Sequence, residues 1–296
     1  MSDVDPFAID KRLARLAFER AAATYDEAAV LQREVGTRML VRLDYIKYLP
    51  RSILDAGSGT GQGSRGLLRR YPKSSVLALD IACAMLRRSQ QRVPRRWLPF
   101  LQRPVTHICG DFECVPLKTS SVDMVWCNLA LQWANQPQRV FAEMHRVLQP
   151  GGLFMFSTFG PDTLKELRQA YAGTDSYSHV HRFIDMHDLG DMLVATGFDT
   201  PVMDMEQISM TYSDVTSLMR DLKSIGAHNV TRGRRQGLAG KSQLQAVTRN
   251  YEQFRRAGRL PATFEVVYGH AWKPEQRATT DGRPVIEIKT QSRSWA

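Results

Sequence analysis

A glycine-rich loop between two acids is the segment of this sequence best suited to binding chemistry. The loop runs Asp55-Ala56-Gly57-Ser58-Gly59-Thr60-Gly61 after a short apolar run, and a second acid, Asp80, ends the next apolar run. Glycines let the backbone approach a bound molecule closely. Open α/β folds bind their ligands at the carboxyl ends of the strands, which is where this loop would lie. The pattern therefore predicts a ligand site between the loop and Asp80.

Two other glycine segments match nucleotide-binding fingerprints but stand in the wrong place. The stretch 61–66 has the form G-x-G-x-x-G of NAD sites. The first glycine of that fingerprint should follow the strand directly, whereas Gly61 already enters the helix. Gly240-Lys241-Ser242 has the ending of a P-loop, but Arg235 stands where that motif needs its first glycine. The sequence disfavours both an NAD site and nucleotide hydrolysis.

Short apolar runs alternate with helical patterns and must position the loop. We expect strands at 52–55, 75–80, 105–109, 123–127 and 152–158, and a helix at 136–148. Alternation of this kind predicts βαβ units in a doubly wound, mostly parallel sheet with helices on both faces. Two helices are expected within 10–47, a helix and a loop at 161–183 and a helix at 187–196. Strands at 202–211 and 263–268 would complete seven strands, with helices at 213–224 and 241–257 inserted before the last.

This pattern divides the chain into four segments. We expect an N-terminal helical lid over 1–48 and a cofactor-binding α/β core over 49–158. Residues 159–272 would supply the substrate-side insertions and complete the sheet. Residues 273–296 form a polar tail punctuated by proline and glycine.

The order of the loop, Asp80, Gly110-Asp111-Phe112 and Asn128-Leu129-Ala130 resembles the motifs of class I S-adenosylmethionine-dependent methyltransferases. The resemblance implies a Rossmann-like fold in which the glycine loop packs on the amino-acid moiety of S-adenosylmethionine. It also implies that Asp80 accepts hydrogen bonds from both ribose hydroxyls, a role that suits a carboxylate. The cofactor-binding residues it implies are Tyr25, Gln32, Asp55, Gly57, Gly59, Gly61, Asp80, Ile81, Met85, Asp111, Phe112, Asn128 and Leu129.

Five further segments narrow the family: 18–26, 31–35, 131–133, 221–227 and 268–272. With the core, they resemble the malonyl-acyl-carrier-protein O-methyltransferases of biotin synthesis, to about residue 277. The resemblance implies transfer of a methyl group to the free carboxylate of a malonyl thioester on an acyl carrier protein. Two parts depart from that family: the arginine-rich stretch 92–104 is expected to be an extension between a helix and the strand at 105–109, and the tail beyond 277 has no recognised counterpart.

Such a reaction asks little of the protein as an acid or base. A carboxylate with a pKa near 4 is already an anion at pH 7, so no general base is needed. Catalysis would consist of alignment and exclusion of water. The site should hold the substrate carboxylate with a cation, preferably the fork of an arginine. We expect Arg168 or Arg182 in that role, with Tyr25 as the residue that closes the lid.

Other side chains have open assignments. Gln32 and Trp133 are expected to line the same cleft as Tyr25, and Phe18 could be simple helix packing. His228 could orient a polar group of the substrate or could end a helix.

The net charge of +10 comes from forty Lys and Arg against thirty Asp and Glu. Two stretches without acids, 81–110 and 222–251, each carry six bases. Their bases are Arg87, Arg88, Arg92, Arg95, Arg96 and Arg103 in the first, and Lys223, Arg232, Arg234, Arg235, Lys241 and Arg249 in the second. Such patches favour an anionic partner, here an acidic carrier protein, although a merely solvated face stays possible.

The four cysteines, Cys83, Cys109, Cys114 and Cys127, form no C-x-x-C pair and have no histidine at zinc spacing. We expect them to be reduced core residues and expect no metal. The acidic N-terminus lacks an apolar signal segment, and the chain has no run of eighteen apolar residues. We therefore expect a cytoplasmic protein with no membrane partner; its oligomeric state stays open.

Two alternatives remain. An RNA methyltransferase would use the clustered bases on phosphates, but no RNA-binding module is present and Asn128-Leu129-Ala130-Leu131 replaces the Pro-Pro-Tyr type of base-amine motif. No nucleic-acid partner is therefore expected. A methyltransferase fold kept as an assembly factor without activity is the other, and the intact loop and acids argue against it.

Overall fold

The computed structural model describes residues 5, 7–92, 105–235, 237 and 240–275. A seven-stranded sheet with the order β3-β2-β1-β4-β5-β7-β6 forms its centre. The pairs among β3, β2, β1, β4 and β5 are parallel, and β7 runs antiparallel to both β5 and β6. This confirms the predicted doubly wound, mostly parallel sheet.

The strands lie close to their predicted positions. They are β1 (Ser52–Ala56), β2 (Ser75–Asp80), β3 (Thr106–Cys109), β4 (Val122–Asn128), β5 (Leu148–Phe159), β6 (Asp199–Tyr212) and β7 (Leu260–Trp272). The α-helices are α1 (Lys11–Ala21), α2 (Tyr25–Ala28), α3 (Val30–Arg42), α4 (Gln62–Arg70), α5 (Cys83–Arg92), α6 (Pro137–Val147), α7 (Lys165–Tyr171), α8 (Met186–Ala195), α9 (Val215–Ser224) and α10 (Lys241–Glu252).

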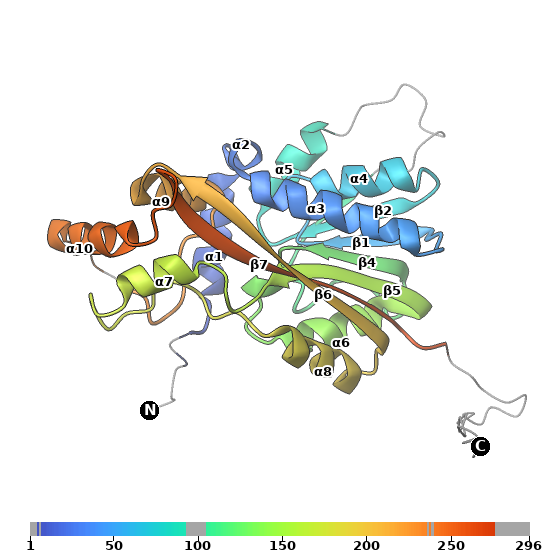
Figure 1. The fold of residues 1–296 in the computed structure, drawn as a ribbon. Coiled ribbons are helices and arrows are strands. Elements are labelled where there is room, and N and C mark those ends of the chain that lie inside the picture. The colour runs from blue at the N-terminus through green and yellow to red at the C-terminus, as the bar shows by residue number, and fades with distance from the viewer. Residues whose placement is uncertain (1–4, 6, 93–104, 236, 238–239, 276–296) are drawn as a thin grey trace, which may run out of the picture.

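The strand period explains the two-sided core. Successive side chains of a strand point to opposite faces of a sheet. In β1, Ile53 packs into the cluster that contains Val35 of α3, whereas its neighbour Leu54 packs into the cluster that contains Phe141 of α6. Helices α3, α4 and α5 therefore cover one face, and α6 and α8 cover the other (Figure 1).

The remaining helices gather at one end of the sheet. Helices α1, α7, α9 and α10 lie there together, where the long strands β6 and β7 project beyond the parallel core (Figure 1). Helices α9 and α10 come between β6 and β7, as predicted for an insertion before the last strand. Helix α2 is joined to α9 at this end by the hydrogen bond from Thr24 to Ser224, and the ring of Tyr25 in α2 stands over Gly59. The glycine loop therefore lies at this end of the sheet as well.

Two helical segments differ from expectation. The region 10–47 forms three helices and a 3-10 turn (Leu43–Tyr45), because the backbone of Ala29, at φ −77° and ψ 47°, leaves the helical region and separates α2 from α3. In 161–183, the helix is limited to the short α7, which begins after Leu164 in a left-handed conformation. In both places the backbone conformation of a single residue interrupts the helix, and the periodicity of apolar residues gives no information on single residues of this kind.

Several expectations fall on residues outside the described ranges. They are the arginine-rich extension from residue 93 to 104, with Arg95, Arg96 and Arg103, and the tail from residue 276 onward. Within the described part of the chain, none of the helices has the length and apolarity needed to cross a bilayer. The cytoplasmic location stays a prediction, as do the four segment boundaries.

Candidate active site

The glycine loop makes a tight turn between β1 and α4. Gly57, Gly59 and Gly61 all have positive φ, at 77°, 53° and 78°, in the left-handed region that side chains other than glycine disfavour. A Cβ on Gly57 would stand 2.4 Å from the Cβ of Ala130, and one on Gly61 would stand 2.0 Å from the Oγ of Ser89. A Cβ on Gly59 would meet nothing nearer than Tyr25, at 3.9 Å. Gly57 and Gly61 thus serve close packing, while Gly59 opens toward the lid.

Asp80 ties this loop to the end of β2. The backbone N–H of Gly59 donates to its Oδ2 and that of Ala82 to its Oδ1, each at 2.8 Å. Burial raises the pKa of Asp80 to about 6, against the opposing effect of these two donors. Asp80 also lines the cavity described below, so its carboxylate joins the loop to the ligand space.

Asp55 has a different position. Its side chain is buried and accepts a hydrogen bond from the Ser64 hydroxyl at 2.6 Å, within α4. Burial raises its pKa to about 6. Asp55 is not among the cavity-lining residues, so it supports the loop from beneath instead of touching a ligand.

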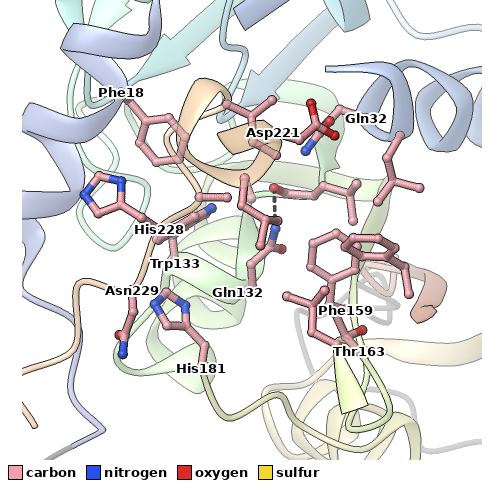
Figure 2. Close-up of a pocket in the computed structure, with 18 of the residues that line it drawn as sticks. Phe18, Gln32, Gln132, Trp133, Phe159, Thr163, His181, Asp221, His228 and Asn229 are labelled. Carbon is pink, nitrogen blue, oxygen red and sulfur yellow. Dashed lines mark hydrogen bonds between the residues drawn. The ribbon is translucent and has the colours of Figure 1, made fainter. Parts of the chain in front are cut away.

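A cavity of about 340 Å³ opens beside the loop and continues toward α7 and α9. Figure 2 shows part of its lining, with Phe18, Trp133, His181 and His228 on one side and Phe159 and Thr163 on the other. Ten of the predicted cofactor residues line it: Tyr25, Gln32, Gly57, Gly59, Asp80, Ile81, Met85, Phe112, Asn128 and Leu129. The predicted cleft residues Phe18 and Trp133 do so as well.

Three predicted cofactor residues do not line this cavity. Asp55 lies beneath the loop, and Gly61 begins α4. Asp111 pairs with Lys11 of α1, Nζ to Oδ1 at 3.2 Å, so it fastens the N-terminal helix to the turn after β3. The sequence motif located the segments beside the cavity but could not separate residues that line it from residues that hold the segment in place.

Tyr25 closes the cavity over the glycine loop. Burial, and then the charges of Asp80 and Asp26, raise the pKa of its hydroxyl well above the ordinary range. The hydroxyl therefore stays protonated at neutral pH and can donate a hydrogen bond but cannot serve as a base. The preceding Thr24 donates its hydroxyl to the Ser224 carbonyl at 3.1 Å, which joins α2 to α9.

Gln32 and Asn128 meet at the inner side of the cavity. The side-chain N–H of Asn128 donates to the backbone carbonyl of Gln32 at 3.0 Å. The side-chain oxygen of Asn128 accepts from the Ser157 hydroxyl at 2.9 Å. The side-chain Oε1 of Gln32 is buried and has no hydrogen-bond partner among the described residues. A buried acceptor without a partner is costly unless a ligand supplies the donor. This acceptor fits a cofactor that carries an ammonium group.

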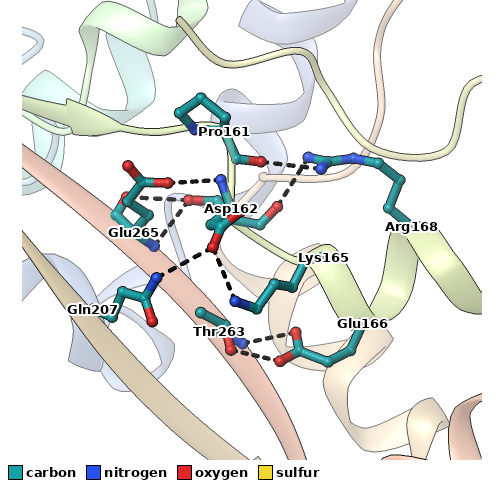
Figure 3. Close-up of polar contacts among 9 residues, drawn as sticks. Pro161, Asp162, Lys165, Glu166, Arg168, Gln207, Thr263 and Glu265 are labelled. Atoms are coloured by element: carbon teal, nitrogen blue, oxygen red, sulfur yellow. Dashed lines mark hydrogen bonds and ion pairs between the residues drawn. The ribbon is translucent and has the colours of Figure 1, made fainter. Parts of the chain in front are cut away.

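The two predicted substrate arginines do not reach the cavity. The guanidinium of Arg168 donates to the Pro161 carbonyl at 3.0 Å and to the Thr163 carbonyl at 3.1 Å (Figure 3). Arg182 is exposed, with its guanidinium 4.7 Å from the ring centroid of Phe7. Neither residue lines the cavity, so the structure does not bring them to it, and their role toward the substrate carboxylate stays a prediction.

A polar network explains where Arg168 points. The backbone N–H of Asp162 donates to Glu265 at 2.7 Å, and buried Glu166 accepts from the backbone N–H of Thr263 at 3.1 Å (Figure 3). These contacts fasten the start of α7 to β7, and Arg168 completes the same turn by binding its carbonyls. Spacing along α7 did not show that its guanidinium is used to hold the chain.

The sequence singled out only the segment 221–227 and His228 in the second half of the cavity. It is lined largely by apolar and aromatic side chains with a few polar groups, namely Phe159, Thr163, Leu164, Leu167, Tyr171, His179, Val180, His181, Phe183, Met210, Tyr212, Met219, Asp221, Leu222, Ile225, Ala227, His228, Asn229 and Phe264. Asp221 is bound by the Tyr212 hydroxyl at 2.8 Å. Periodicity marks such residues as core, because a cavity wall and a packed core share the same pattern.

The cysteines also differ from expectation. Cys83 at the start of α5 and Cys109 at the end of β3 form a disulfide, with Cα atoms 5.7 Å apart. Cys114 is exposed and Cys127 is buried. The two partners are distant in sequence, but the parallel register places Cys109 beside Asp80, three residues before Cys83. The prediction of four reduced core cysteines was wrong for this pair and for Cys114. Among the described residues, no group of three potential metal ligands converges.

Comparison with known proteins decides the family. The model of the family "Methyltransferase domain" matches residues 54–156, which span the loop, Asp80 and Asn128. A malonyl-(acyl-carrier protein) O-methyltransferase of Nitrosospira multiformis is 59% identical over 281 residues, 92% of each chain. One from Gallionella capsiferriformans is 56% identical and covers 96% of this chain and 98% of its own. The chain belongs to the malonyl-(acyl-carrier protein) O-methyltransferase family. Within this family, it is an S-adenosylmethionine-dependent O-methyltransferase, as the sequence motifs predicted.

Solved structures of other proteins share the fold of this member of the family. The YcgJ protein from Bacillus subtilis aligns with a TM-score of 0.58 at 12% identity, over 81% of this chain and 99% of that one. A SAM-dependent methyltransferase from Thermotoga maritima aligns with a TM-score of 0.51 at 15% identity, over 88% and 99%. At these identities, the likeness concerns the fold alone.

Proposed function

We propose that this protein transfers a methyl group from S-adenosylmethionine to the free carboxylate of a malonyl thioester on an acyl carrier protein, an early step of biotin synthesis. The names of the full-length relatives support this substrate over RNA. The observation that carries the proposal is the continuous cavity, which leads from the glycine loop and Asp80 into a largely apolar second half.

The first half of the cavity is proposed to hold the cofactor. Asp80 would accept from the ribose hydroxyls, and Gly57 and Gly59 would let the backbone approach the amino-acid moiety. Gln32 has the free acceptor for an ammonium group. Ile81, Met85, Phe112, Asn128 and Leu129 would supply the remaining walls. When bound, S-adenosylmethionine supplies an activated methyl group on a positively charged sulfur.

The protein's own contribution would be orientation and exclusion of water. The substrate carboxylate is ionised at neutral pH without help from a base. Tyr25 is held in its protonated form, which suits a hydrogen-bond donor at the junction of lid and loop. The aromatic wall with Phe159, Phe183 and Phe264 keeps the second half of the cavity apolar, which strengthens electrostatic interactions inside it.

An acidic carrier protein is the partner we propose. Arg232, Arg235 and Lys241 are exposed on the segment that follows His228, a cavity-lining residue. Positive charge on this segment would attract an acidic partner to the part of the surface next in sequence to His228 and speed association at low salt. Of the first basic stretch, Arg87 and Arg88 are exposed on α5, and Arg92 pairs with Asp26, next to Tyr25.

The proposal also assigns a separate role to each of three segments of the chain. Residues 1–48 would form the lid, 49–158 the cofactor-binding core and 159–272 the substrate side. The contact between Thr24 and Ser224 supports a lid built from the N-terminal helices together with α9, one of the helices inserted before β7.

The direct test is incubation of the purified protein with S-adenosylmethionine and malonyl-carrier protein, followed by the intact mass of the carrier. We expect a gain of one methylene on malonyl-carrier protein and none on acetyl-carrier protein, which lacks the free carboxylate. Retention of the starting mass by the malonyl form, with the cofactor shown to bind, would refute the proposed function.

A further inference from the structure

One side of the cavity carries a group of polar side chains that the motifs do not explain. His181, in the connection between α7 and α8, and His228, after α9, lie there beside Trp133, Gln132 and Asn229 (Figure 2). The edge of the His181 ring meets Trp133, with ring centroids 5.1 Å apart. Residues from three distant parts of the chain thus converge at the same wall.

The two imidazoles have hydrogen-bonding capacity to spare. The backbone N–H of Val230 donates to Nε2 of His181 at a long 3.5 Å, which favours the tautomer with its proton on Nδ1. That N–H is then available as a donor. Among the contacts of the described residues, none is a hydrogen bond to the His228 ring. A third cavity histidine, His179, is already engaged by Asp175 at 2.8 Å.

Positive charge surrounds this wall. Arg20 of α1, Lys223 of α9 and Arg234 of the following loop act on His228 and, after burial, lower the pKa of its imidazole. Burial and then His228 lower the pKa of His181 to about 4. A field that opposes a proton on the imidazoles attracts an anion to the same place. The acid on this side of the lid, Asp221, is bound by the Tyr212 hydroxyl.

We propose that His181 and His228 together hold the carboxylate that receives the methyl group. The proposal deepens the proposed function and rests on it. Among the described residues that line the cavity, none is an arginine or lysine, and His179 is already paired with Asp175, so His181 and His228 are the lining side chains left to become cations beside a ligand. Arg20, Lys223 and Arg234 supply the field without lining the cavity.

Binding of the carboxylate should then be linked to proton uptake. An anion between the rings raises the pKa of both imidazoles, so the bound state takes up protons that the free enzyme lacks. Binding should tighten as the pH falls from 8 to 6, above the range in which the substrate itself protonates. The other titratable groups of the cavity, Asp80, Asp221, Tyr25, Tyr212 and the His179–Asp175 pair, are held in internal contacts or buried. A neutral acyl thioester gains nothing from this wall.

The test compares His181→Gln, His228→Gln and the double variant with the wild type. Glutamine keeps a donor but cannot become a cation. We expect each single change to raise KM for the malonyl thioester about tenfold, the usual effect of losing one charge-assisted hydrogen bond. The Kd of S-adenosylmethionine should stay within about twofold, which also reports an intact fold. The fall of KM between pH 8 and pH 6 should disappear in the double variant.

His187→Gln is the matched control, since His187 is exposed on α8 and does not line the cavity. Arg168→Ala tests the competing assignment, in which Arg168 holds the substrate carboxylate. An active wild type with unchanged KM in the histidine variants, or a tenfold rise in Arg168→Ala alone, would overturn the inference and leave the proposed function standing. A wild type that binds S-adenosylmethionine but methylates no malonyl thioester would overturn both.

Discussion

The backbone N–H of Gly59 donates to the carboxylate of Asp80 at 2.8 Å, across the gap between the loop after β1 and the end of β2. This bond joins the two parts of the sequence that first indicated a ligand site. It also leaves the carboxylate exposed to the cavity, where Asp80 is one of the lining residues. The predicted cofactor site is therefore held together by a group that also lines the cavity.

Asp80→Asn tests this double use. The amide keeps an acceptor for Gly59 but loses the charge and one of its two acceptor oxygens, so we expect S-adenosylmethionine to bind at least tenfold more weakly. Titration calorimetry measures the affinity. Asp111→Asn is the control, because Asp111 pairs with Lys11 outside the cavity and its change should alter the affinity less than threefold. Equal affinities for wild type and Asp80→Asn would remove Asp80 from the binding site.

Gly57→Ala and Gly59→Ala separate backbone strain from steric conflict. Both residues have positive φ, which disfavours alanine by about 1–2 kcal/mol. At Gly57, the new methyl group would in addition meet Ala130 at 2.4 Å, whereas at Gly59 it would make an ordinary contact with Tyr25 at 3.9 Å. We expect Gly57→Ala to lower the free energy of unfolding by roughly 2 kcal/mol more than Gly59→Ala. Urea denaturation checks this, and an equal loss in the two variants would show that the loop can move away from α-carbon substituents.

Because Asp55 is buried, we expect its replacement by asparagine to increase the free energy of unfolding by an amount that depends on pH. Its pKa is raised from 3.8 to about 6, so the folded state binds its proton more tightly than the unfolded state. The destabilisation caused by its charge grows as the pH rises from about 4 to about 6 and is fully present above that range. Asp55→Asn should therefore gain roughly 2 kcal/mol of stability relative to wild type between pH 4.5 and pH 7. A difference that does not change with pH would mean that Asp55 titrates normally.

The disulfide between Cys83 and Cys109 predicts the thiol count. Without reductant, the denatured protein should expose two reactive thiols, those of Cys114 and Cys127, and with reductant all four. The loop closed by this bond is long enough for a stabilisation of about 3 kcal/mol. The double variant Cys83→Ser, Cys109→Ser should melt like the reduced wild type. Four thiols in the absence of reductant would show that the bond does not form in solution.

Charge reversal tests the carrier surface. Arg232→Glu with Arg235→Glu should lower kcat/KM for malonyl-carrier protein about tenfold and have little effect on malonyl-pantetheine, which has the same acyl thioester but neither the acidic protein nor a phosphate. Raised salt should reduce the rate of the wild type toward that of the variant. Lys118→Glu is the matched control, because Lys118 is exposed just before β4, at the amino-terminal end of the parallel strands, whereas the glycine loop follows the carboxyl end of β1. A loss of the same size with both substrates would place the two arginines in the reaction instead of in docking.

The sequence predicted the fold and most residues of the first half of the cavity because both depend on local patterns. Runs such as Ser75–Asp80 end in a residue that lines the cavity, and the glycines follow β1 directly. The substrate half depends on where side chains point after folding. Arg168 lies on the expected helix, yet its guanidinium is used by the carbonyls of Pro161 and Thr163.

His181 shows the same limit in the opposite direction. It is a single histidine with no motif around it, and it reaches the cavity only because the connection between α7 and α8 passes beside Trp133 and Val230. The cysteine pair likewise depends on the register of β2 and β3. Contacts between segments far apart in the chain are not encoded in any local pattern.

The most direct test of the account is to identify the methylated atom. Malonyl-carrier protein is incubated with the enzyme and S-adenosylmethionine labelled in its methyl group, and the acyl group is then released and analysed by tandem mass spectrometry. We predict that the label appears as the methyl ester of the malonyl carboxylate. Label on the carrier polypeptide or on the pantetheine arm, or no label despite bound cofactor, would contradict the account.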